Sequence, residues 1–134
     1  GVGKVKVPSV RISDASIKEV TFEIEFFVNN THNALGGKLD SVEYAVYMSG
    51  SRDGDYSFVG NGSMGQVTVP PSERTTEVGG FEAEYSDIVS AVGSSAVESE
   101  GSLYARVEGE ASIRLGPFGF SVPFEETRRV IQND

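Results

Sequence analysis

The chain of 134 residues has the length of one domain, and its apolar residues are spread along the whole sequence, which argues against a small core with a long disordered tail. It contains no cysteine, which excludes disulfides, thiolate nucleophiles and thiolate metal sites and leaves the redox compartment open. A formal net charge of −9 argues against nucleic acid or an anionic membrane surface as a partner, because both attract basic patches. We expect one folded domain over residues 1–134.

No apolar run approaches the roughly 18 residues needed to span a bilayer, and residues 1–10 do not have the pattern of a secretory leader. We therefore expect a soluble domain and slightly favour the cytoplasm, with a leader or anchor outside the given sequence as the alternative. Many carboxylates and only four lysines are also typical of proteins that work in high salt, where counterions screen repulsion. A halophilic protein of this kind would gain stability steeply in KCl, whereas an ordinary acidic surface would not.

The clearest strand signal lies in residues 21–28, where apolar and acidic side chains alternate with a period of two: Phe22, Ile24, Phe26 and Val28 against Glu23 and Glu25. Residues 5–12 alternate more weakly and contain Pro8, which suits an edge strand or the approach to one. Residues 29–38 are rich in Asn and Gly and indicate a loop, and the next strand is expected at residues 41–48.

A second group of strands is expected further along the chain. Residues 52–55 predict a hairpin turn that leads into a short strand at residues 56–60. Residues 66–69 are extended and end at two prolines, and residues 75–83 alternate again, with a bulge expected at Gly79 and Gly80.

One segment breaks the strand pattern. In residues 85–97 the apolar side chains of Ile88, Val89 and Val92 have helical spacing, Ser86 is the expected N-cap, and Gly93 is a candidate for the end of the helix.

Alternation returns after this helix. Strands are expected at residues 103–108, 110–115 and 120–124, with Gly109 turning the chain between the first two. About seven short strands and one short helix predict an antiparallel, all-β sandwich or barrel.

Several short motifs follow one another in a distinctive order along the chain: Val7-Pro8-Ser9-Val10, Phe26-Phe27-Val28-Asn29-Asn30, Val42-Glu43-Tyr44-Ala45-Val46, Val69-Pro70-Pro71, the helix at residues 87–91, residues 104–109 and Val122-Pro123-Phe124. In this order they resemble the water-stress-and-hypersensitive-response (WHy) domain of late embryogenesis abundant proteins. One departure is Asn30, which stands where the family has proline. The resemblance implies a sandwich similar to immunoglobulin and fibronectin type III domains, and a protective role in drying, cold and hypersensitive responses without a reaction, cofactor or substrate.

Candidate catalytic groups are sparse. The single histidine, His32, lies in a polar loop, and no serine has the Gly-x-Ser-x-Gly context of a hydrolase nucleophile. Carboxylates two residues apart share a strand face, but their apolar neighbours place them toward solvent: Glu23/Glu25, Glu82/Glu84, Glu98/Glu100 and Glu108/Glu110. We therefore expect no catalytic residue, no cofactor and no enzymatic activity.

Two further groups have a weaker signal for binding. Asp53 and Asp55 offer hard oxygen ligands for calcium in a flexible turn, but lack the other acidic ligands of a calcium loop, so no metal site is expected. Pro117, Phe118 and Phe120 form either an aromatic loop tip that contacts an apolar partner or a turn that caps the end of the sandwich, and the cap is the favoured interpretation.

Two functional hypotheses follow from these features. The first is a non-enzymatic domain that protects client proteins or surfaces during desiccation or osmotic stress through weak, nonspecific contact. The second is an immunoglobulin-like adhesion or assembly module of a larger cell-surface protein. The sequence leaves the oligomeric state open.

Overall fold

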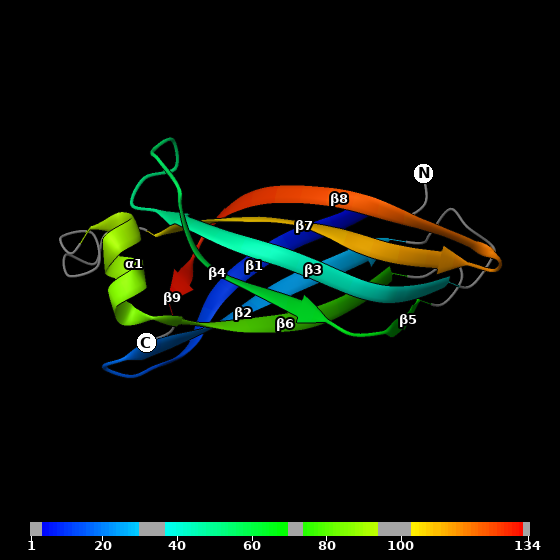
Figure 1. Ribbon diagram of the computed structural model, residues 1–134, viewed down its shortest axis with the longest axis horizontal. Coiled ribbons are helices and arrows are strands. Elements are labelled where there is room, and N and C mark those ends of the chain that lie inside the picture. The colour runs from blue at the N-terminus through cyan, green and yellow to red at the C-terminus, as the bar shows by residue number, and fades with distance from the viewer. Residues whose placement is uncertain (1–3, 30–36, 70–73, 94–102, 133–134) are drawn as a thin grey trace.

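The computed structural model, which describes residues 4–29, 37–69, 74–93 and 103–132, consists of two β-sheets and one helix (Figure 1). The first sheet, sheet A, has the strand order β6-β2-β1-β9, with β1 (Lys4–Ala15), β2 (Glu19–Asn29), β6 (Arg74–Glu84) and β9 (Ile131–Gln132). The second, sheet B, has the order β4-β3-β7-β8 and a short strand paired with β3: β3 (Gly37–Ser49), β4 (Ser57–Met64), β5 (Val67–Val69), β7 (Tyr104–Leu115) and β8 (Phe118–Arg129). Apart from a two-residue parallel contact between β1 and β9, the pairings are antiparallel, which confirms the all-β sandwich.

The core lies between the sheets and is built by alternation along each strand. Phe22, Ile24 and Phe26 of β2 are fully buried, while Glu23 and Glu25 face outward. This arrangement confirms the prediction for residues 21–28, because a period of two sends successive side chains to opposite faces of a sheet.

Large aromatic side chains alternate with glycine across the inner face of sheet B. Tyr44 of β3 lies directly between Gly62 of β4 and Gly109 of β7, and Gly109 in turn pairs with Phe124 of β8. A methyl group at Gly62 would lie 2.6 Å from the Tyr44 hydroxyl oxygen, and one at Gly109 would lie 2.8 Å from Cζ of Phe124. The two glycines therefore provide the space that the two rings occupy.

The expected turn at Gly109 is wrong, because β7 runs without interruption from Tyr104 to Leu115. Glycine is needed at this position for close packing and not for chain reversal. The chain reverses instead after β7, where Gly116 has a φ of 57° and leads into β8.

The Tyr44 hydroxyl joins the two sheets. It donates a hydrogen bond of 2.7 Å to the carbonyl oxygen of Gly80 in β6, and its ring centroid lies 5.1 Å from that of Phe26 in β2. A methyl group at Gly79 would lie 2.9 Å from the same hydroxyl. The bulge expected at Gly79 and Gly80 is wrong, since β2 and β6 pair in unbroken register there, and Gly79 is small to accommodate Tyr44.

Burial raises the pKa of the Tyr44 phenol above its ordinary value of about 10. The folded state therefore keeps this proton at a pH where the unfolded chain releases it, so the stabilisation is present below about pH 10 and is lost as pH rises further. We expect the free energy of unfolding to fall more steeply above about pH 10 in the native protein than in Tyr44→Phe, measured by urea unfolding at successive pH values. A native profile as shallow as that of Tyr44→Phe would contradict the assignment, and Tyr85→Phe, which removes an exposed hydroxyl, is the control.

At the opposite edge of the sandwich, β1 contains a bulge. Lys6 pairs with Phe27 and Ser9 with Glu25, so Val7 and Pro8 together face one residue of β2. Proline has no N–H to donate to a ladder, and β9 pairs with β1 only further along, at Arg11 and Ile12. The predicted edge strand is therefore confirmed only around Pro8, because β9 makes β1 an inner strand at Arg11 and Ile12.

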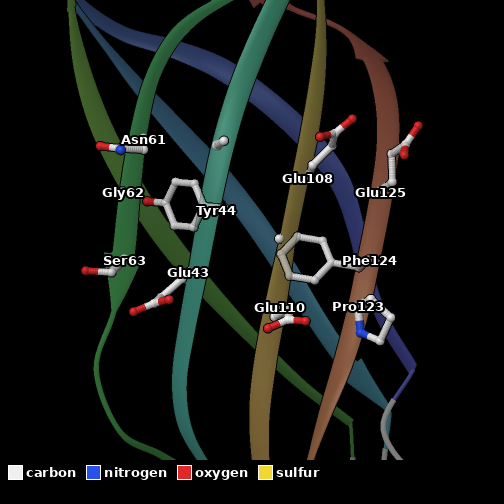
Figure 2. Close-up of a pocket in the computed structure, with 12 residues that line it drawn as sticks. Glu43, Tyr44, Asn61, Gly62, Ser63, Glu108, Glu110, Pro123, Phe124 and Glu125 are labelled. Atoms are coloured by element: carbon white, nitrogen blue, oxygen red, sulfur yellow. The ribbon is translucent and has the colours of Figure 1, made fainter.

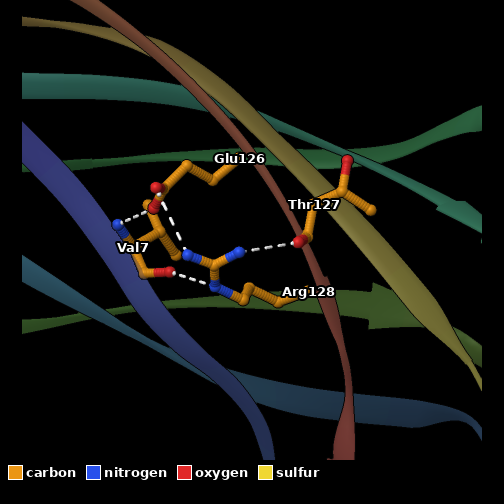
Figure 3. A network of polar contacts seen from close by, with 4 residues as sticks. All are labelled: Val7, Glu126, Thr127 and Arg128. Atoms are coloured by element: carbon orange, nitrogen blue, oxygen red, sulfur yellow. Dashed lines mark hydrogen bonds and ion pairs between the residues drawn. The ribbon is translucent and has the colours of Figure 1, made fainter.

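Side chains of β8 take the place of a neighbouring strand at this bulge (Figure 3). The Val7 N–H donates to Oε2 of Glu126, and Nε of Arg128 donates to the Val7 carbonyl oxygen at 2.9 Å. Arg128 also pairs with Oε1 of Glu126 at 3.3 Å and donates to the carbonyl oxygen of Thr127 at 3.0 Å. The polar groups of Val7 are thus satisfied although no strand of the described residues pairs with them on this side.

The predicted helix is present as α1 (Tyr85–Val92), which lies at one end of the sandwich, opposite the β7–β8 turn (Figure 1). It ends at Gly93, as expected, with a φ of 88° and an N–H donated to Val89 at 2.7 Å. Ser86 as N-cap is wrong, because the cap position is occupied by Glu84, whose side chain makes no capping bond. The backbone N–H of Tyr85 instead donates to the carbonyl oxygen of Lys18 at 2.7 Å, so the β1–β2 connection positions the helix start.

The remaining sequence predictions have mixed outcomes. The β3–β4 hairpin is present, with Gly54 donating to the Ser51 carbonyl oxygen at 3.1 Å in its turn. The expected strand at residues 120–124 is longer at both ends, as β8. His32, the Glu98/Glu100 pair and the Pro70-Pro71 turn lie outside the described residues.

Candidate functional site

An acidic groove of about 740 Å³ lies on the outer surface of sheet B (Figure 2). Its carboxylates come from three adjacent strands: Glu43 of β3, Glu108 and Glu110 of β7, and Glu125 of β8. Ala45 lies beside Glu108 and adds little bulk, which leaves the surface hollow between the longer side chains. We call this surface the acidic groove.

The carboxylates of the acidic groove face one another across the strands. Glu43 lies directly opposite Glu110, and Glu108 lies directly opposite Glu125. Like charges in such cross-strand positions repel and destabilise a sheet. Within the described residues, one of the four carboxylates is in an ion pair, namely Glu108 with Nε of Arg106 at 3.0 Å. The groove therefore retains a concentrated negative potential.

Beyond the groove, toward α1, the same face of sheet B carries a cluster of aromatic and arginine side chains. The guanidinium of Arg106 lies 5.1 Å from the ring centroids of both Tyr47 and Tyr56, and that of Arg52 lies 5.4 Å from Tyr104. Phe58 packs edge-on against Tyr47 at 5.7 Å and is 55% exposed. We call these six residues the aromatic–arginine patch.

The patch has its own internal contacts. The Tyr56 hydroxyl donates to the carbonyl oxygen of Arg52 at 2.8 Å, which ties the β3–β4 turn to the patch. Burial raises the pKa of Tyr56, against the opposite influence of Arg52 and Arg106. Cation–π contacts of this kind hold a guanidinium plane against the rings while leaving much of its hydrogen-bonding edge available.

Sequence reasoning found only part of these two surfaces. It correctly placed Glu108 and Glu110 toward solvent, but did not bring them together with Glu43 and Glu125. The facing of Glu108 and Glu125 had a usable signal, since both are equally distant from the turn between β7 and β8. The sequence contains no such signal for the pairing of Glu43 with Glu110, because β3 and β7 are far apart in the chain and no single turn connects them.

The candidate binding residues from the sequence lie at other places. Pro117, Phe118 and Phe120 form the tip and start of β8, with Phe118 70% exposed and Phe120 37% exposed. Phe118 is thus not buried as a cap, and contact of this tip with a partner stays a prediction. Asp53 and Asp55 are exposed in the β3–β4 turn, and the described residues contain no group of three or more His, Cys, Asp or Glu side chains that could hold a metal ion.

Comparison with known proteins locates the fold. No model of a known protein family and no curated protein matches the sequence. A protein from Archaeoglobus fulgidus has a similar structure, with a TM-score of 0.62, 16% identity, and coverage of 96% of this chain and 95% of that chain. AT1g01470 from Arabidopsis thaliana is similar with a TM-score of 0.64, 13% identity, and coverage of 99% and 83%, and the structural-genomics target SoR45 with 0.60, 15%, and coverage of 98% and 88%. At these identities the likeness shows a shared fold.

The chain therefore shares its antiparallel β-sandwich fold with solved structures from an archaeon and a plant. No helix among the described residues is long and apolar enough to cross a membrane.

Proposed function

We propose that this chain is a WHy-type domain that protects client proteins or surfaces during desiccation or osmotic stress, without catalysing a reaction. The residues that resemble the family's motifs have defined packing roles in the fold, which supports the proposal. Val7 and Pro8 form the bulge that β8 side chains close, Tyr44 bridges the sheets, and Pro123 and Phe124 flank the acidic groove. At each of these positions the motif residue makes a contact that holds this sandwich together or shapes its surface.

The acidic groove is the observation that carries the proposed mechanism. Its four carboxylates stand on paired strands, so their backbone positions are fixed close together and the negative charge stays concentrated there. Such a surface binds water and counterions strongly and repels other acidic proteins at short range. As solvent is lost, a hydrated acidic surface that contacts clients weakly would keep them separated from one another.

The test is recovery of a labile reporter enzyme after drying and rehydration with the protein. We expect the native chain to preserve more activity than an equal mass of an unrelated acidic β-sandwich. The triple variant Glu43→Lys, Glu110→Lys and Glu125→Lys should lose this advantage, because it changes the electrostatic potential of the groove from negative to positive. All three side chains are exposed, so the fold should tolerate the substitutions.

A matched control separates the groove from net charge alone. Glu19→Lys, Glu25→Lys and Glu82→Lys change the net charge by the same +6, from −9 to −3, at positions outside the groove. Retained protection in this control and lost protection in the groove variant would support the proposal. Equal recovery in both variants and in the native protein would refute a role of the groove.

The adhesion or assembly module stays the second candidate, because the β7–β8 tip exposes Phe118 and Phe120 at the end of the sandwich opposite α1 (Figure 1). Loops at the ends of sandwiches are common sites of partner binding. Tandem copies of the domain or a membrane anchor in the complete reading frame would favour this candidate over the protective role.

A further inference from the structure

The outer face of sheet B has two regions of opposite character along the same strands. The acidic groove occupies the part around Glu43 and Glu110, and the aromatic–arginine patch occupies the part nearer to α1. Arg129 extends the positive region, because it pairs with Tyr104 at the end of β8 and is exposed. The chain has 11 basic and 20 acidic residues, so three arginines close together are unusual for it. Because they lie beside four carboxylates, one face of the sheet has both a positive and a negative region.

We propose that this face binds the same face of a second copy of the chain, forming a weak two-fold dimer. A two-fold axis that lies in the interface and runs across the strands near Val107 exchanges the two ends of β7. Each copy then places its aromatic–arginine patch over the acidic groove of the other. An interface of this kind uses one patch twice and requires the self-complementarity that this face has.

The charge register along β7 supports this arrangement. Tyr104 and Arg106 lie on one side of Val107, and Glu108 and Glu110 lie at the same distances on the other side, all four on the outer face. Rotation about the axis therefore brings Arg106 toward the partner's Glu108. It also places Arg129, beside Tyr104, over the partner's Pro123, which is paired with the partner's Glu110, so the long Arg129 side chain reaches this carboxylate diagonally.

The size of the face argues for weak association. Four strands about 4.8 Å apart and about nine residues long at roughly 3.3 Å per residue present about 600 Å². Stable complexes bury about 800 Å² per partner, so this face falls somewhat below that size. The net charge of −9 on each copy opposes contact as well, but charges farther apart than about 8 Å are largely screened at physiological salt. Stacking of Arg52 and Arg106 on aromatic rings reduces the entropy lost when a carboxylate binds them.

The experiment is sedimentation equilibrium of the full chain at physiological salt, up to about 1 mM protein, a range suited to weak complexes. We expect concentration-dependent dimers. Arg129→Glu and Glu110→Arg should each weaken the dimer by about tenfold, since each substitution enters the two-fold interface twice and turns attraction into repulsion. Both side chains are exposed, and circular dichroism checks that each variant is folded.

Mixing the two variants tests the interface itself. In a mixed dimer, the new carboxylate at position 129 of one copy meets the new guanidinium at position 110 of the other, and the second contact is native. Both contacts are then attractive, so affinity should return to within about threefold of the native value. Net charge cannot produce this pattern of loss and recovery, because Glu110→Arg reduces the negative net charge from −9 to −7 and by that effect alone would strengthen its own dimer, whereas Arg129→Glu increases it to −11. Lys6→Glu and Glu82→Arg make the same charge changes on the outer face of sheet A and should leave the dimer intact.

Three results would overturn the proposal. The first is a native chain that stays monomeric up to about 1 mM, the range in which a weak complex is detectable. The second is a dimer that the sheet A reversals weaken as much as the sheet B reversals. The third is a mixture of Arg129→Glu and Glu110→Arg whose dimer affinity fails to recover. If Phe118→Ser then abolishes the dimer, the β7–β8 tip is the contact between the two copies instead. The proposal does not depend on the protective role.

Discussion

Gly109→Ala is expected to lower the free energy of unfolding by at least about 3 kcal/mol, the upper part of the range for overpacked cores. The added methyl group would overlap the carbonyl oxygen of Glu43 and lie 2.8 Å from Cζ of Phe124. The first of these atoms belongs to the backbone of a paired strand, so it cannot move without disturbing the β3–β7 ladder. The loss would be a large part of the roughly 5–15 kcal/mol that is typical of a whole domain.

Urea unfolding followed by circular dichroism measures this effect. The control is Gly119→Ala on β8, the strand next to β7, where the added methyl group would come no closer than 3.9 Å to the Ile113 carbonyl oxygen. We expect this control to change stability by less than about 0.5 kcal/mol. A Gly109→Ala protein as stable as the control would show that sheet B can relax around an added methyl group, contrary to the packing described here.

Glu126→Ala is expected to lower the free energy of unfolding by about 2–3 kcal/mol, because it removes a charge-assisted acceptor. In the native structure the carboxylate accepts from the Val7 N–H and pairs with Arg128 at 3.3 Å. Alanine leaves the N–H without this acceptor and the guanidinium without its counterion. The loss is local to the edge where β1 and β8 meet, so hydrogen exchange of the Val7 amide should accelerate.

Glu125→Ala is the matched control for this variant. It removes the preceding carboxylate on the same strand, which faces Glu108 on the outer surface and is in no ion pair among the described residues. We expect unchanged or slightly higher stability, since a repulsive cross-strand contact is lost. Equal losses from the two substitutions would mean that a general effect on β8, and not the contact with Val7, determines the result.

Local pattern predicted much of this structure. Alternation in residues 21–28 and 41–48 placed the buried and exposed faces of β2 and β3, and Gly93 was expected at the end of α1. These features depend on neighbours two to four residues away, where side-chain direction follows from backbone geometry alone. The predicted N-cap failed for the opposite reason, because a backbone bond from Tyr85 to Lys18, set by the packing of distant segments, positions the helix.

The sequence by itself determined that this is a β-sandwich with acidic outer faces and a short helix. Only the tertiary structure decided why Gly109 and Gly79 are glycines, since a turn and a bulge were expected there and each instead gives space to an aromatic ring. It also decided how the two sheets are joined. Tyr44 bonds to a residue 36 positions away in the sequence, and Val7 bonds to residues 119 and 121 positions away. The acidic groove and the aromatic–arginine patch arise in the same way. They depend on strand register, which is set by the packing of the whole sandwich and leaves little trace in any single segment.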